Sequence, residues 1–124
     1  MKTPQVLVAH NDEPAVAVDA VDWIVVPGTQ ESLFACRDMR EDGTACHEWM
    51  LAHRPTRHMI LHSVPTADMA LGIGIVLWAA MSSDFRVAML SNTNRDELIE
   101  LVKAEPDFKR TLARVIEALI DMKE

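Results

Sequence analysis

The pattern of hydrophobic and polar positions changes character near residue 65 of this 124-residue chain. Before that point, short runs rich in Val, Ile and Leu are separated by turn residues, a pattern that is typical of β-strands. After it, apolar residues recur every three or four positions, as they do on one face of a helix. The pattern therefore predicts one α+β domain over residues 1–124, with a β-rich N-terminal half of about four short strands packed against a helical C-terminal half.

Turn residues divide the N-terminal half into segments short enough to be strands. Pro27-Gly28 and Glu41-Asp42-Gly43 are turn signals, and the glycine of the second suits the last, left-handed position of a hairpin loop. Asn11–Pro14 is a further polar turn. Cys46–His53 is expected to form a short helix that ends before Arg54-Pro55. The predicted strands are Gln5–Ala9, Ala15–Val26, Leu33–Met39 and Met59–Val64.

The first predicted helix of the C-terminal half begins after Thr66 and runs to about Met81. Thr66 can cap it, because a threonine side chain at this position accepts a hydrogen bond from a free backbone N–H of the first turn. The helix is apolar all round, so we expect it to be buried on every side. Gly72 and Gly74 leave an alternative, in which residues 72–77 form a buried strand.

Two further helices are the clearest predictions. Thr93 or Asn94 can cap the first of them, which ends near Glu105, and Pro106 then suits the first position of the last helix. Apolar residues recur at helical spacing from there to Met122 and should face the core. The residues of this stripe that we expect to be buried are Phe108, Leu112, Val115, Ile116 and Leu119.

Composition and charge exclude several classes of protein. The chain has 19 acidic and 12 basic residues, and its net charge of −7 opposes the approach of nucleic-acid phosphates. Its longest uncharged stretch, Met69–Ser83, is shorter than the ~20 residues that a membrane span needs. Two cysteines are too few for a disulfide scaffold and no export signal is visible, so we expect a cytoplasmic protein with reduced thiols.

Segment 36–62 has the most unusual composition, because it holds both cysteines and four of the five histidines. Thiolate and imidazole are good zinc ligands, and the candidate ligands are Cys46, His47, His58 and His62. Their spacing matches no standard zinc signature, and His58 and His62 would lie roughly 13 Å apart on one strand. We therefore expect no bound cofactor, and zinc remains the alternative.

The two cysteines also flank a predicted hairpin. Cys36 and Cys46 are symmetric about Glu41, but Gly43 moves the centre of the hairpin toward Asp42 and offsets them. A catalytic cysteine needs a site that stabilises its thiolate, and the sequence contains no sign of one. Two idle or buried thiols are the simpler interpretation.

Large and flexible apolar residues suggest an interface. Three tryptophans and eight methionines are many for a small domain with a limited interior. Tryptophan is a frequent interface anchor, and glycines on a helix let another backbone approach closely. The interface candidates are Trp49, Gly72, Gly74 and Trp78, and we expect a homodimer or a dedicated protein partner.

These observations favour a non-enzymatic binding or regulatory module, such as an accessory or inhibitor protein, that acts through protein–protein contacts. The acidic balance favours a basic partner. A small metal-binding domain or metal-dependent enzyme that uses segment 36–62 is the alternative. A third hypothesis is a DNA-binding regulator that uses the basic residues of the last two helices, although the net charge opposes it. Those basic residues are Lys103, Lys109, Arg110 and Arg114.

Overall fold

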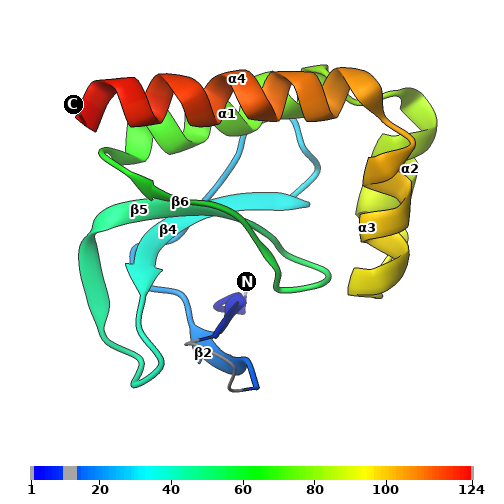
Figure 1. The fold of residues 1–124 in the computed structure, drawn as a ribbon. Helices are drawn as coiled ribbons and strands as arrows, with labels where there is room; N and C mark the ends of the chain where they lie inside the picture. Colours follow the sequence, from blue (N-terminus) through cyan, green and yellow to red (C-terminus); the bar gives the residue numbers. More distant parts are fainter. Residues whose placement is uncertain (1, 10–13, 124) are drawn as a thin grey trace.

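A computed structural model describes residues 2–9 and 14–123 of the chain (Figure 1). These residues form two antiparallel sheets followed by four helices, which confirms the predicted α+β class. They contain six strands where about four were expected. The strands are β1 (Gln5–Val8), β2 (Val16–Asp19), β3 (Ile24–Val25), β4 (Leu33–Met39), β5 (Ala45–His53) and β6 (Met59–Val64), and the helices are α1 (Ala67–Ala79), α2 (Ser83–Ser91), α3 (Arg95–Lys103) and α4 (Pro106–Lys123).

The elements form three layers, and the larger sheet is the middle one. Its strand order is β3-β4-β5-β6. Figure 1 shows α1 and α4 on one side of this sheet and the β1–β2 hairpin on the other. Each side has its own cluster of buried apolar residues, the larger beneath the helices and the smaller beneath the hairpin. Helices α2 and α3 turn away from the direction of α4 and lie beside one end of the sheet (Figure 1).

The hairpin between β4 and β5 forms as the turn residues predict. Met39 pairs with Ala45, so the hairpin is centred on Asp42, and Gly43 adopts a left-handed φ of 85°. Cys36 pairs with Met50 and is therefore not opposite Cys46. Of the predicted Asn11–Pro14 turn, residues 11–13 lie outside the described residues.

The predicted strand Ala15–Val26 is wrong as a single element, because the chain changes sheets within it. β2 pairs with β1, whereas β3 pairs with β4. Asp22, between them, has a left-handed φ of 56°, which lies outside the β region and turns the chain away from β2. Its carboxylate lies 3.3 Å from Nε of Arg37, and this ion pair holds the bend against β4.

The predicted helix Cys46–His53 is also wrong, because this segment forms most of β5. β5 is an inner strand that pairs with β4 on one side and β6 on the other. Its residues from Trp49 to His53 are all buried, so the strand has no solvent-facing side there. A strand that is covered on both faces lacks the alternation of apolar and polar residues, and periodicity cannot distinguish it from a short helix.

Helix α1 resolves the choice between a helix and a strand for residues 72–77. Thr66 caps it as expected, since its side chain accepts a hydrogen bond from the N–H of Met69 at 3.2 Å. Gly74 faces the sheet, where a Cβ atom would lie 2.8 Å from Cγ2 of Val26. The absence of a side chain at Gly74 therefore lets the helix approach the sheet closely.

The expectation that α1 is buried on every side is wrong. Only one side packs on the sheet, where Ala70, Gly74 and Leu77 are buried. Ile75 and Val76 on another side are 46% and 51% exposed. The reason is that α4 and the sheet together cover only part of the helix circumference, so part of an entirely apolar helix faces solvent.

The remaining helices agree with the sequence except for α2, which was not predicted. Ser82 caps α2 by accepting from the N–H of Phe85 at 3.1 Å, but polar residues obscure the short apolar pattern that follows. Asn94, rather than Thr93, caps α3. None of the described helices is both long and apolar enough to cross a bilayer.

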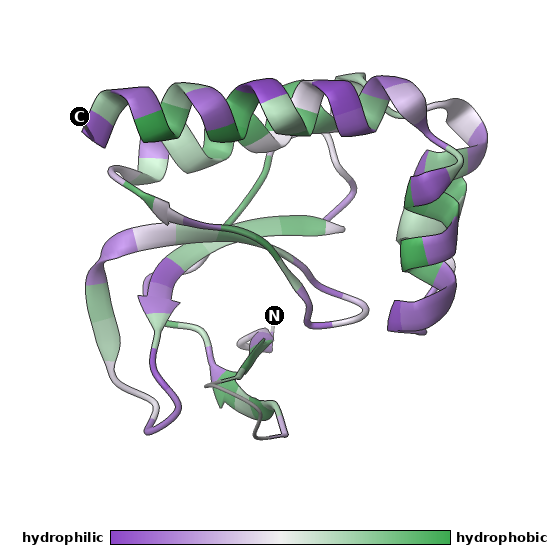
Figure 2. Ribbon diagram, viewed as in Figure 1, coloured by the Kyte–Doolittle hydropathy of each residue, from purple (hydrophilic) through white to green (hydrophobic). Residues whose placement is uncertain are grey.

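Helix α4 carries alternating bands of hydrophobic and hydrophilic residues (Figure 2). Phe108 and Leu119 are buried, and Leu112 and Val115 are partly buried against the same core. Ile116 is 40% exposed, so the expectation that it is buried is wrong. Consecutive residues of a helix point in different directions, because a turn takes 3.6 residues. Ile116, which directly follows Val115, therefore lies at the edge of the apolar stripe and not at its centre.

Candidate functional site

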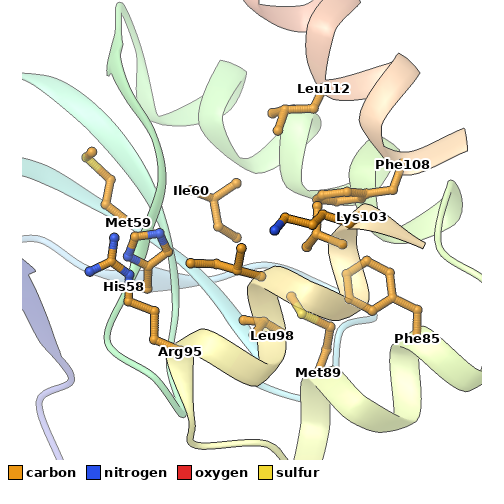
Figure 3. Close-up of a pocket in the computed structure, with 12 residues that line it drawn as sticks. His58, Met59, Ile60, Phe85, Met89, Arg95, Leu98, Lys103, Phe108 and Leu112 are labelled. Carbon is orange, nitrogen blue, oxygen red and sulfur yellow. The ribbon is translucent and has the colours of Figure 1, made fainter. Parts of the chain in front are cut away.

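A cavity of about 230 Å³ lies where β6 and the three helices α2, α3 and α4 meet (Figure 3). The tertiary arrangement creates it, because α2 and α3 extend beyond the sheet and leave space between themselves and β6. The lining residues are His58 before β6, Met59 and Ile60 of β6, Phe85 and Met89 of α2, Arg95, Leu98, Ile99, Val102 and Lys103 of α3, and Phe108 and Leu112 of α4.

Most of the cavity wall is apolar and rigid. Phe85 and Phe108 pack edge to face, with ring centroids 5.3 Å apart and planes at 86°. Both rings are almost fully buried, as are Met89 and Leu98. For comparison, a closed cavity of roughly 150 Å³ lined by Leu, Ile and Phe is large enough to bind benzene.

The charged groups of the lining are basic. Among its described residues are Arg95, Lys103 and His58, and neither Asp nor Glu. The Lys103 ammonium lies 2.9 Å from a carboxylate oxygen of Glu100. Arg95 makes no ion pair with a carboxylate among the described residues. The protein as a whole has a net charge of −7, so the charge at this cavity is opposite in sign to that of the surrounding molecule.

Figure 3 shows how the lining residues are arranged along the cavity, with Lys103 drawn on the same side as Phe85 and Phe108. The Arg95 guanidinium lies beside the His58 imidazole at one end, and Phe85 and Phe108 lie at the other. Burial of His58 lowers its pKa, and the charge of Arg95 lowers it further. His58 is therefore neutral at pH 7, and Arg95 supplies the positive charge at this end.

A buried histidine holds the α2 wall of the cavity in place. Nε2 of His53 lies 2.6 Å from the carbonyl oxygen of Met89, so this nitrogen must donate its proton. Nδ1 then accepts a hydrogen bond from the hydroxyl of Thr56 at 2.8 Å. The Met89 carbonyl is in the last turn of α2, where a helix leaves its carbonyls unpaired. Burial lowers the pKa of His53, so the imidazole bonds as a neutral group.

The structure separates the candidate zinc ligands of segment 36–62. His58 lines the cavity described above, whereas His62 lies on β6 and its Nδ1 is 2.8 Å from Oγ of Ser63. His47 is exposed on β5. Among residues 2–9 and 14–123, no three side chains of His, Cys, Asp or Glu are placed to hold a metal ion.

Two of these candidates do come near each other, beside a carboxylate that the sequence analysis missed. Cys46 and His62 line a second hollow, of about 290 Å³, together with Asp38. Oδ2 of Asp38 accepts from the N–H of Ser63 at 3.0 Å, while Oδ1 is buried and has no partner among the described atoms. Burial raises the pKa of Asp38. A single aspartate in a strand carries no sequence signal, because residues of β1, β5 and β6, distant in the sequence, surround the same hollow.

The other cysteine is chemically inert. Cys36 is fully buried in β4, and burial, with a smaller effect of Asp38, raises the pKa of its thiol to about 12. A thiol with such a pKa is not a nucleophile at neutral pH. Both cysteines are free thiols.

Two of the four interface candidates are inside the folded chain. Trp49 is 9% exposed and packs in the larger core, where the Arg37 guanidinium lies 4.6 Å from its ring centroid. Gly74 is buried against the sheet. Neither is therefore available to a partner. Trp78 is partly buried, with the Arg86 guanidinium 5.9 Å from its ring centroid, and Gly72 is exposed.

Gly72 belongs to an apolar stripe that faces solvent. With Ile75, Val76 and Ala79 it follows the i, i+3, i+4, i+7 spacing of one helix face, and all four residues are exposed. We refer to these four residues as the α1 stripe. A Cβ atom at Gly72 would meet no described atom within 4 Å, so the backbone itself is accessible there.

Two of the four basic residues that the DNA-binding hypothesis uses pair with carboxylates. Lys103 pairs with Glu100, and Arg110 lies 3.2 Å from Asp107. The Lys109 ammonium donates to the carbonyl of Lys103 at 3.0 Å. This arrangement stabilises the helix ends and leaves little of the continuous positive surface that DNA recognition requires.

Comparisons of the chain with protein-family models, with curated proteins and with solved structures find no match.

Proposed function

We propose that this protein is a non-catalytic binding module of the accessory or regulatory kind, which acts through protein–protein contacts and self-associates through the α1 stripe. The observation that carries the proposal is the exposure of Ile75 and Val76, at 46% and 51%, on a helix that has no polar residue on this face beyond Asp68. Large contiguous apolar patches on a protein surface are typical of interaction sites.

The occupant that we propose for the stripe is a second copy of the same helix. A twofold axis brings identical surfaces together, so an apolar stripe meets an apolar stripe without any other protein. If the helices cross antiparallel, the two copies of Asp68, which lies in the first turn of α1 before the stripe, are at opposite ends and do not repel each other. Gly72 and Ala79 add little bulk, so the two backbones can approach closely around Ile75 and Val76.

The acidic balance of the chain supports a basic protein as the target of the assembled module. With 19 acidic and 12 basic residues, each chain contributes a net charge of −7. Complementary charge speeds the encounter with a basic partner, and salt weakens this effect. Binding of the target should therefore slow as the ionic strength rises.

Val76→Glu and Val87→Glu form a matched pair for testing self-association. Both replace an exposed helical valine by the same charge, but Val76 lies in the α1 stripe and Val87, 64% exposed, lies on α2. Sedimentation equilibrium from about 1 to about 200 µM should show a dimer whose dissociation constant rises at least about tenfold in Val76→Glu. Val87→Glu should associate like the wild type.

Circular dichroism and thermal melting should show that both variants fold. A wild-type chain that remains monomeric at every concentration would overturn the self-association proposal. Equal weakening by the two glutamates would also overturn it, because the effect would then come from added charge and not from the stripe.

A further inference from the structure

We propose that the cavity between β6 and α2–α4 binds a small aromatic carboxylic acid, with the aromatic ring against Phe85 and Phe108 and the carboxylate on Arg95. This would be a ligand site separate from the α1 stripe, and it rests on different observations: the volume, the lining and the charge at one end of the cavity.

The volume and lining set the size and chemistry of the apolar part. A cavity of roughly 150 Å³ is enough for a benzene molecule, so about 230 Å³ holds such a ring with room for a short linker. Phe85 and Phe108 already pack edge to face at one end, and a third ring can continue this arrangement. Met89 beside them offers a polarisable sulfur that adapts to an aromatic ring.

The charge at the other end sets the polar part of the ligand. Arg95 has no carboxylate partner among the described residues, so its guanidinium is available to a carboxylate that enters the cavity. A planar guanidinium matches a carboxylate with two parallel hydrogen bonds. His58 beside it is neutral and can donate a further hydrogen bond, and the described lining contains no acidic residue that would repel an anion.

The ligand class follows from the placement of the basic and aromatic residues at opposite ends of the cavity. Figure 3 shows Arg95 and His58 across the cavity from Phe85 and Phe108, with Ile60 and Leu98 between them. A ligand that reaches both ends needs an aromatic ring and a carboxylate joined by a short aliphatic linker. Phenylpropanoate has this shape, and phenylpropanol is its neutral counterpart.

An NMR titration of the full-length chain with these two compounds tests the proposal. Phenylpropanoate should shift the methyl signals of Ile60 and Leu98, and it should bind at least about tenfold more tightly than phenylpropanol, a difference of about 1.4 kcal/mol. Its binding should also raise the pKa of His58, because a carboxylate beside an imidazole favours the protonated form.

Two variants separate the role of the charge from that of the cavity. Arg95→Gln should remove the preference for the acid and leave the binding of phenylpropanol unchanged. Arg114→Gln is the control, because it removes the same charge from an exposed position of α4 that is not part of the lining. Val102→Phe should fill the cavity and abolish the binding of both compounds, and a melting curve would verify that this variant folds.

Three results would overturn the proposal. The first is no chemical-shift change with either compound at about 10 mM, a concentration that reveals even weak binding. The second is equal affinity for acid and alcohol, which would leave an apolar cavity without anion recognition. The third is equal loss of affinity in Arg95→Gln and Arg114→Gln, which would assign the preference for the acid to net charge and not to Arg95.

Discussion

The two glycines of α1 provide a direct test of how this helix packs. Gly72 and Gly74 are two residues apart in the same helix, so Gly→Ala brings the same gain in helix propensity at both, about 0.5–1 kcal/mol. Their surroundings differ completely. A Cβ atom would meet no described atom within 4 Å at Gly72, whereas at Gly74 it would lie 2.8 Å and 3.0 Å from the γ-carbons of Val26 and 3.1 Å from Cδ1 of Leu51.

The steric cost at Gly74 can be estimated from these distances. Carbon atoms attract each other best at roughly 3.5–4.0 Å, so the new methyl group would overlap three atoms at once. Val26 and Leu51 are fully buried and cannot swing into solvent. Such overpacking costs about 1–3 kcal/mol, which outweighs the gain in propensity. We expect Gly72→Ala to stabilise the protein by up to about 1 kcal/mol and Gly74→Ala to destabilise it by up to about 2 kcal/mol.

Urea denaturation at one low protein concentration measures both changes, with far-ultraviolet circular dichroism as the probe. The difference between the two variants isolates the steric cost, because the change in propensity cancels. A second substitution tests its origin: Val26→Ala removes both γ-carbons and should cost less beside Ala at position 74 than in the wild type. If Gly72→Ala and Gly74→Ala stabilise the protein equally, α1 does not pack closely on the sheet at Gly74 and the reasoning is refuted.

Three further predictions concern buried groups. Burial lowers the pKa of His53, so at mildly acidic pH the unfolded chain binds a proton there that the folded chain does not. The free energy of unfolding should therefore fall as the pH drops below the ordinary histidine pKa of about 6.5. This fall should be less steep in His53→Gln than in His47→Gln, the control at an exposed position. In urea denaturation, Leu119→Ala should lower the free energy of unfolding by about 2–5 kcal/mol, and Ile116→Ala by less than about 1 kcal/mol, because only Leu119 is buried. Similar losses in the two variants would contradict this placement of α4. The free energy of unfolding of Asp38→Asn should remain within about 1 kcal/mol of the wild-type value, because the amide keeps the hydrogen-bond acceptor and avoids burying a charge. Asp38→Ala, which removes the acceptor, should lower it by about 1–3 kcal/mol. An asparagine as costly as the alanine would show that the carboxylate charge itself is needed.

The amino-acid sequence by itself determined those elements whose signals lie within a few residues. Thr66 and Asn94 accept hydrogen bonds from backbone N–H groups two or three positions further on, so each cap can be identified from its own neighbourhood. Gly43 adopts the left-handed conformation that its hairpin loop requires. Helix α4 has a regular apolar stripe along 18 residues, and only its width was misjudged at Ile116.

Tertiary structure alone decided which apolar segments face each other and which face solvent. β5 is a strand because β4 and β6 pair with both of its edges, and nothing within residues 46–53 records those neighbours. Ile75 is exposed and Leu77 buried, although both belong to one uniformly apolar helix, because the sheet covers only one side of it. The cavity has the same origin. The bond from His53 to the carbonyl of Met89, 36 residues away, joins β5 to one wall of the cavity, and such a contact has no local signal because its two partners meet only after the chain has folded.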